Sequence, residues 1–136
     1  MKKVNNISVL LLLVLIFSGI SCEPIDEPEA DDPRDVFIGT WSVNETCSKS
    51  NYTVTISQDP YNSSQVLLSN FANPNMGDPA VGIVTTNKIT LDPSQKIGNN
   101  WTVSGTGNYI SHTLIEWTFS LEIAGNQENC SADYTR

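Results

Sequence analysis

The sequence has little of what catalysis and nucleic-acid binding require. It contains one histidine, His112, and only seven lysine and arginine residues against fifteen aspartate and glutamate residues, for a net charge of −8 at pH 7. Nucleic acids and anionic membrane surfaces attract clusters of basic side chains, so we expect neither as an electrostatic partner. A nucleophilic triad would depend on this histidine, which falls in an expected hairpin turn. We therefore expect a protein that is not an enzyme.

Metal-ligating residues are also scarce. The chain has three cysteines besides its single histidine, whereas a zinc site takes three or four convergent ligands, and no calcium-loop spacing of acidic residues occurs. Glycoside hydrolysis takes two facing carboxyl groups, and Glu45 is the only acid on an expected inward face. We expect no metal and no cofactor.

The first 21 residues have the pattern of a secretory signal. Lys2 and Lys3 precede an apolar run from Ile7 to Phe17, which is shorter than the ~20 apolar residues that a membrane-spanning helix needs. The run leads through small residues to Cys22. The segment resembles a bacterial lipoprotein signal peptide, which implies cleavage before Cys22 and acyl chains on that cysteine as a membrane anchor. An ordinary cleaved signal is the alternative.

Residues 22–35 are expected to form a tether between the lipidated cysteine and a domain at 36–136. Residues 23–35 contain seven acidic residues, three prolines and one arginine, a composition that favours an extended, self-repelling chain. The acidic stretch also resembles the surface-export signals of Bacteroidetes lipoproteins. That resemblance implies an outer-membrane lipoprotein displayed on the cell surface, and a solvated spacer is the alternative.

The two other cysteines form an even pair. If Cys22 is acylated, Cys47 and Cys130 remain, and disulfides persist outside the cytoplasm. We expect a disulfide between them, with two free thiols as the alternative.

From Val36 onward the sequence predicts an all-β domain. Short segments rich in Val, Ile, Thr, Trp and Tyr alternate apolar and polar residues between turn signals, and no long segment has a helical period. The expected strands are 36–47, 51–58, 64–71, 80–86, 88–92, 100–110, 112–124 and 128–135. Most connections are short, so we expect successive strands to pair as antiparallel neighbours in an up-and-down meander. A two-sheet immunoglobulin-like sandwich is the rival fold.

The first expected strand carries a family signature. Gly39-Thr40-Trp41 resembles the Gly-x-Trp motif of lipocalins. Together with the leader, the acidic tether, Glu45-x-Cys47 and Tyr52-x-Val54-x-Ile56, it is similar to small lipocalin-like lipoproteins of Bacteroidetes. The resemblance implies a closed up-and-down barrel of about eight strands. It also implies an arginine from late in the chain over the ring of Trp41.

The cysteines predict the register between the first and last strands. These two strands are antiparallel neighbours in an up-and-down barrel with an even number of strands. If Cys47 lies opposite Cys130, Trp41 lies opposite Arg136. A cation–π contact between that pair would contribute ~0.5–2 kcal/mol.

The interior of the barrel is the candidate ligand site. The same register places Glu45 inward, opposite Ala132, either wet near the barrel mouth, hydrogen-bonded by Tyr52, or as the polar anchor of an apolar pocket. Inward aromatic residues would line that pocket, and a plain packed core is the alternative. The candidate ligand-binding residues are Trp41, Glu45, Tyr52, Trp101, Tyr109, Trp117 and Tyr134.

Two inward glycines stand out late in the chain. Gly105 and Gly107 share the inward parity of Trp101, and glycine at such positions makes room for a large neighbour such as an indole. The segment from Ser104 to Tyr109 also resembles the Ser-Gly-x-Gly loop of lipoprotein lysozyme inhibitors.

Two functions are compatible with these features. The first is binding of a small apolar or amphipathic ligand inside the barrel; the second is a surface module, such as an enzyme inhibitor, that binds protein or glycan through loops such as 71–80. An internal cavity of about 300 Å³ or more opening beside Glu45 favours the first function. A filled interior with an exposed aromatic patch favours the second.

Overall fold

The computed structural model describes residues 31–93 and 95–136. The predicted signal peptide, the lipidation site Cys22 and tether residues up to 30 lie outside the described residues and stay predictions. Within the described ranges, no helix has the length and apolar character needed to cross a membrane.

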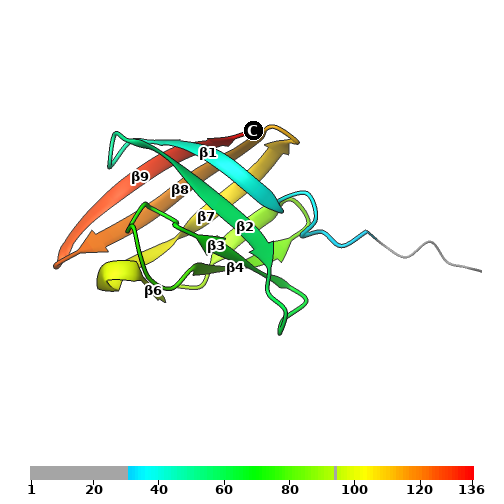
Figure 1. Cartoon of the computed structure of the whole chain (residues 1–136), viewed down its shortest axis with the longest axis horizontal. Coiled ribbons are helices and arrows are strands. Elements are labelled where there is room, and N and C mark those ends of the chain that lie inside the picture. The colour runs from blue at the N-terminus through cyan, green and yellow to red at the C-terminus, as the bar shows by residue number, and fades with distance from the viewer. Residues whose placement is uncertain (1–30, 94) are drawn as a thin grey trace, which may run out of the picture. The chain divides into compact units, whose positions relative to one another are not determined.

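The described chain contains nine strands and is all-β (Figure 1). The strands are β1 (Gly39–Glu45), β2 (Asn51–Gln58), β3 (Gln65–Ser69), β4 (Ala80–Thr85), β5 (Lys88–Leu91), β6 (Gln95–Ile97), β7 (Trp101–Ser111), β8 (Leu114–Ile123) and β9 (Asn126–Thr135), with a 3₁₀ turn, η2 (Gly98–Asn100), before β7. Eight of these strands match the expected ones within a few residues at each end.

The strands close into a barrel. Their order is β5-β4-β3-β2-β1-β9-β8-β7-β6, and β5 also pairs with β7. Eight strands therefore complete the ring, and β6 is an additional strand beside β7. Neighbouring strands are antiparallel. The predicted up-and-down barrel is confirmed, and the two-sheet sandwich is excluded because one sheet closes on itself.

The sequence prediction missed β6, which lies in a segment expected to be a turn. Three residues are too few to show alternation. On the side away from β7, the Gln95 side chain substitutes for a strand neighbour: its Oε1 accepts a hydrogen bond from the Val81 N–H at 2.6 Å, and its Nε2 donates to the Val81 carbonyl at 2.7 Å. A side-chain amide thus satisfies both backbone groups of a residue in β4.

Strands β1 and β9 pair in the predicted register. Glu45 lies opposite Ala132, and Val43 lies opposite Tyr134. Beyond these pairs, Cys47 and Cys130 form a disulfide with their Cα atoms 5.5 Å apart. The predicted disulfide is confirmed, although Cys47 lies in the turn after β1 rather than on the strand.

Arg136 closes one end of the barrel over Trp41. Its Cζ atom lies 4.0 Å from the centroid of the Trp41 ring. Its guanidinium donates hydrogen bonds to the carbonyls of His112, Ile38 and Val36 at 2.7, 2.8 and 3.3 Å. The guanidinium thus ties the end of the chain to the segment before β1 and to the β7–β8 turn.

We expect Arg136→Lys to lower the free energy of unfolding by about 1–2 kcal/mol. A lysine ammonium has no planar fork, so it cannot lie flat on the indole while donating to several carbonyls. Urea denaturation measures the change, with Lys88→Arg, an exchange at an exposed position of β5, as the control. A midpoint for Arg136→Lys equal to that of the control would contradict the assigned role.

The packed part of the chain begins before the expected boundary at residue 36. Arg34 is 7% exposed, and its guanidinium donates to the carbonyls of Asp59 and Asn62 in the β2–β3 connection and of Gln65 at the start of β3. It also forms an ion pair with Asp32 at 2.6 Å. The end of the predicted tether therefore belongs to the barrel, because three converging carbonyls make a cation site that the local sequence does not reveal.

The alternating inward residues form one core, and glycine makes room for its largest member. A Cβ atom at Gly107 would lie 2.4 Å from the Trp117 ring, and the two residues face each other across β7 and β8. The predicted accommodation of an indole is confirmed. At Gly105, a Cβ atom would lie 2.5 Å from the Phe119 backbone, so β7 and β8 approach each other closely here.

Candidate functional site

The polar centre of the interior is Glu45, at the end of β1. We call this end of the barrel, which also carries the disulfide, the mouth. Glu45 is 4% exposed. Its Oε2 accepts a hydrogen bond from the Tyr52 hydroxyl at 2.5 Å, and its Oε1 accepts one from the Ser48 N–H at 3.2 Å. Both hydrogen bonds offset the cost of burying a carboxylate. Of the alternatives expected for Glu45, the hydrogen bond from Tyr52 is the one observed.

Tyr134 adds a second buried hydroxyl to this centre. It is 0% exposed, and its hydroxyl has no hydrogen-bond partner among the described residues. Burial raises the pKa of Tyr134 well above its ordinary value, and the nearby Tyr52 and Glu45 raise it further. Tyr52 and Tyr134 both lie opposite Val43, on the two strands that flank β1.

The loop after β3 contacts the same centre. Burial raises the pKa of Tyr52, and the hydrogen bond to Glu45 raises it further, while the backbone of Ala72 acts in the opposite direction. The Phe71 ring of the same loop packs against Tyr134, with the two ring centroids 6.4 Å apart.

We expect the barrel to lose stability as the pH rises above 10. Tyr52 and Tyr134 have folded-state pKa values above the ordinary 10.0, so the unfolded chain releases their protons first. The contribution of these two tyrosines to the free energy of unfolding is complete below pH 10, and it is lost as the pH rises through their folded-state pKa values. Ultraviolet absorbance should show two of the four tyrosines ionising only together with unfolding. Ionisation of all four while the circular dichroism stays native would contradict this.

A pocket lies beside Glu45, but it is small. Its volume is about 160 Å³, and it is lined by residues 44–46 of β1 and the following turn and by residues 131–133 of β9. The first function was expected to have an internal cavity of about 300 Å³ or more at this place. The pocket is about half that size.

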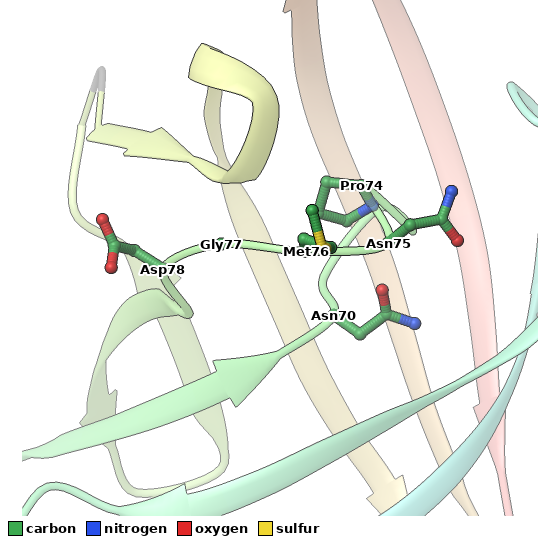
Figure 2. A pocket seen from close by; sticks show the side chains of 6 residues that line it. All are labelled: Asn70, Pro74, Asn75, Met76, Gly77 and Asp78. Atoms are coloured by element: carbon green, nitrogen blue, oxygen red, sulfur yellow. The ribbon is translucent and has the colours of Figure 1, made fainter.

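A larger pocket lies on the loop between β3 and β4. It has a volume of about 270 Å³ and is lined by Asn70 and residues 74–78. Figure 2 shows the side chains of Asn75 and Asp78 pointing in different directions. In a preformed binding site, a few polar groups converge on one point. The polar groups of this pocket do not converge in this way.

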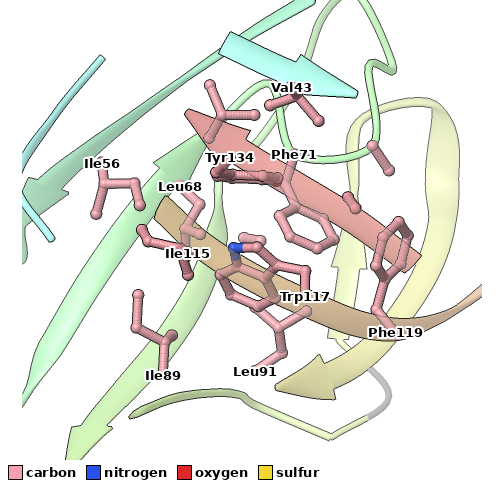
Figure 3. Packing of buried hydrophobic residues seen from close by; sticks show 14 of the residues in the cluster. Val43, Ile56, Leu68, Phe71, Ile89, Leu91, Ile115, Trp117, Phe119 and Tyr134 are labelled. Atoms are coloured by element: carbon pink, nitrogen blue, oxygen red, sulfur yellow. The ribbon is translucent and has the colours of Figure 1, made fainter. Parts of the chain in front are cut away.

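Phe71 fills the mouth of the barrel (Figure 3). It comes from the loop after β3, and its ring centroid lies 5.1 Å from that of Trp117, 4.9 Å from that of Phe119 and 6.4 Å from that of Tyr134. The Phe71 side chain is 1% exposed. Sequence reasoning placed it at the end of the expected strand 64–71, where the surface loop 71–80 begins, whereas β3 ends at Ser69. The signal that could have identified it is a large aromatic residue in a segment otherwise rich in Asn, Pro and Gly.

The seven candidate ligand-binding residues divide between the two ends. The four that gather around Phe71 and the mouth are Glu45, Tyr52, Trp117 and Tyr134. Trp101, at the start of β7, is partly buried against the core. Trp41 and Tyr109 belong to the opposite end, where Arg136 covers Trp41 and the Tyr109 ring packs edge-on against Phe37 at 5.6 Å. Those two have structural contacts that a ligand at the mouth would not share.

The surface described by the structure shows no concentration of aromatic residues. Its exposed large apolar side chains come from six different segments and include one aromatic residue, Tyr61; they are Val36, Tyr61, Met76, Ile83, Ile110 and Ile123. Across residues 31–93 and 95–136, no group of three His, Cys, Asp or Glu residues could hold a metal ion. His112 is exposed in the β7–β8 turn.

No protein-family model matches this chain, and no curated protein matches it. Among solved structures, the chain is similar to EF1p2_mFAP2b bound to DFHBI, with a TM-score of 0.49, 15% identity, and coverage of 77% of this chain and 97% of that one. It is also similar to a redesigned beta barrel, b11L5F_LGL, with a TM-score of 0.48, 13% identity, and coverage of 77% and 95%.

Proposed function

We propose that this protein is a non-enzymatic binding module that holds a small apolar or amphipathic ligand at the mouth of its barrel. The supporting observation is the buried polar centre: Glu45 is hydrogen-bonded by Tyr52, and the Tyr134 hydroxyl, on β9 beside β1, has no hydrogen-bond partner among the described residues. An unsatisfied buried polar group costs about 1–3 kcal/mol, and an apolar residue would fill a purely structural core without that cost. A few polar groups in an apolar enclosure are typical of a ligand site.

The charge of the site restricts the ligand. Residues 31–136 contain eleven acidic and five basic residues, and Glu45 is the carboxylate nearest the proposed position. An anion would lose its hydration without gaining a cationic partner. The ligand is therefore neutral or cationic.

The same proposal includes a cellular location. The leader and Cys22 support a lipoprotein that is held on the outer membrane by acyl chains, with the acidic segment as a tether and display on the cell surface as its consequence. The supporting observation is the sequence pattern of residues 1–35.

A surface interaction with a protein or glycan is the second candidate function. It is favoured by Met76, which is 78% exposed and borders the pocket of about 270 Å³ between β3 and β4. In this case the contacts lie on the outside of the loop and do not involve Glu45.

Native mass spectrometry of the chain purified from the cells that make it tests the proposal. We expect a small molecule bound in addition to any acyl modification. Glu45→Gln should reduce the bound fraction because it removes the charge of the polar centre, whereas the matched exchange Glu122→Gln, at an exposed position of β8, should leave it unchanged. Bare polypeptide in every sample, or equal loss in both variants, would contradict ligand binding and favour the surface interaction.

A further inference from the structure

The side chain that fills the mouth is not carried by a strand. Trp117 and Phe119 lie on β8 and Tyr134 lies on β9, where backbone ladders hold them on both sides. Phe71 follows the end of β3 and has no ladder partner. All four side chains are at most 3% exposed, so no water-sized space separates them. A molecule can reach the Tyr134 ring only if one of these groups moves, and Phe71 is the one without a strand to hold it.

The loop that carries Phe71 has an unusual backbone. Asn70, Ala72, Asn73 and Asn75 have φ angles of 66°, 61°, 57° and 68°. Side chains with a Cβ atom rarely adopt this left-handed conformation, and asparagine tolerates it best. Because Ala72 lacks that tolerance, contacts with the rest of the protein must hold it there.

Two sets of contacts hold the loop. On the side of β2, Asn70 Nδ2 donates to the Thr53 carbonyl at 3.0 Å. On the outside, Asn99 Nδ2 donates to the Pro74 carbonyl at 2.5 Å.

Glycines bring the outer part of the loop against η2. A Cβ atom at Gly98 would lie 1.7 Å from the Met76 carbonyl oxygen, and one at Gly77 would lie 2.3 Å from the Gly98 Cα atom. The loop is therefore seated backbone against backbone, and one added methyl group at Gly98 would push it away.

We propose that Phe71 is a displaceable plug at the ligand position, and that the ligand is a planar, neutral or cationic aromatic molecule with one hydrogen-bond acceptor. When the loop 70–79 moves away, the ligand ring takes the place of the Phe71 ring, and its acceptor meets the Tyr134 hydroxyl. This inference rests on the proposed function and adds the ligand class and the moving part.

The shape of the position supports a flat ring. The plane of Phe71 makes angles of 67° with both Trp117 and Phe119, so the ring presents its edge or face to two aromatic neighbours at favourable distances. A planar aromatic group reproduces both contacts. The hydroxyl of Tyr134, which has no hydrogen-bond partner in the part of the chain that the structure describes, supplies a donor that Phe71 cannot use.

Coumarin and naphthalene are suitable probes because both are neutral fused bicycles and only coumarin carries a carbonyl acceptor. Phe71→Ala alone would not be decisive, since an engineered apolar cavity binds any small ring. Gly98→Ala is the more specific test of the displaceable plug, because it displaces the loop without changing a side chain of the core. Ile110→Ala, a change at an exposed position of β7 outside the loop, is the control.

We expect coumarin to bind the full chain and to shift the aromatic NMR signals of Phe71 toward solvent-exposed values. Gly98→Ala should bind coumarin about tenfold more tightly than wild type, because the open state no longer has to be populated first. Ile110→Ala should behave as wild type. Tyr134→Phe should abolish the preference for coumarin over naphthalene, which we expect to be about fivefold in wild type from one hydrogen bond.

The outcomes separate this inference from the proposed function. If a ligand co-purifies with the wild type but Gly98→Ala binds coumarin no more tightly and the Phe71 signals stay unshifted, the plug is wrong and ligand binding stands. If coumarin and naphthalene bind equally with Tyr134 present, the assigned ligand class is wrong. If a folded Gly98→Ala variant binds neither probe and no ligand co-purifies with wild type, both proposals fail.

Discussion

Replacing Cys47 and Cys130 together by alanine should lower the free energy of unfolding by about 4 kcal/mol. The disulfide joins residues 83 positions apart, and closing a loop of that length restricts the unfolded chain by an amount in this range on the loop-entropy model. It also holds β1 to β9 beyond their last backbone pair, beside Glu45. Urea denaturation under non-reducing conditions measures the effect.

Reduction of the wild type is the matched control for that experiment. Reduction should lower the free energy of unfolding by the same amount as the double substitution, since both changes remove the crosslink and leave the rest of the chain unchanged. A loss below about 1 kcal/mol in both cases would mean that backbone pairing alone closes the barrel, and that the disulfide contributes little restriction.

Gly107→Ala should destabilise the barrel by about 3 kcal/mol, a large effect for one methyl group. The added Cβ atom would lie between 2.4 and 2.7 Å from three atoms of the Trp117 ring. An indole inside a packed core has no free direction in which to move, so the strands must separate. Asn108→Ala, at the neighbouring exposed position, should change stability by less than about 0.5 kcal/mol.

A double-mutant cycle tests whether the indole is the cause. In a Trp117→Leu background, adding Gly107→Ala should cost less than about 1 kcal/mol, which leaves a coupling free energy of about 2 kcal/mol between the two positions. If the changes in the free energy of unfolding are additive, Gly107 is required by the conformation of the β7 backbone and not by the Trp117 ring.

The strands and their register could be predicted because they depend on short-range geometry. Successive side chains in a strand point to opposite faces, so alternation in the sequence marks which side faces the core. For β1 this places Trp41 and Val43 inward, as observed. The disulfide then sets the β1–β9 register, and the contact between Trp41 and Arg136 follows from it.

The candidate site could be predicted only in part. Glu45 and Tyr52 could be placed inward on adjacent strands, and their hydrogen bond was one of three alternatives for Glu45. Phe71 was missed because its place in the mouth depends on how a loop folds back, and alternation does not extend into loops. Trp41 and Tyr109 were included because inward parity does not tell which end of a barrel a side chain occupies.

The sequence by itself determined the β class, the order of the eight ring strands, their inward faces and the closure of the barrel. The period of two specifies each inward face locally, and two cysteines 83 positions apart specify which strands meet. Only the tertiary structure decided that Arg34 binds the β2–β3 carbonyls, that Gln95 satisfies the backbone of Val81 in β4, and that Phe71 fills the mouth. The reason is physical: each of these contacts joins segments that are far apart along the chain and becomes favourable only when the closed sheet has brought them together.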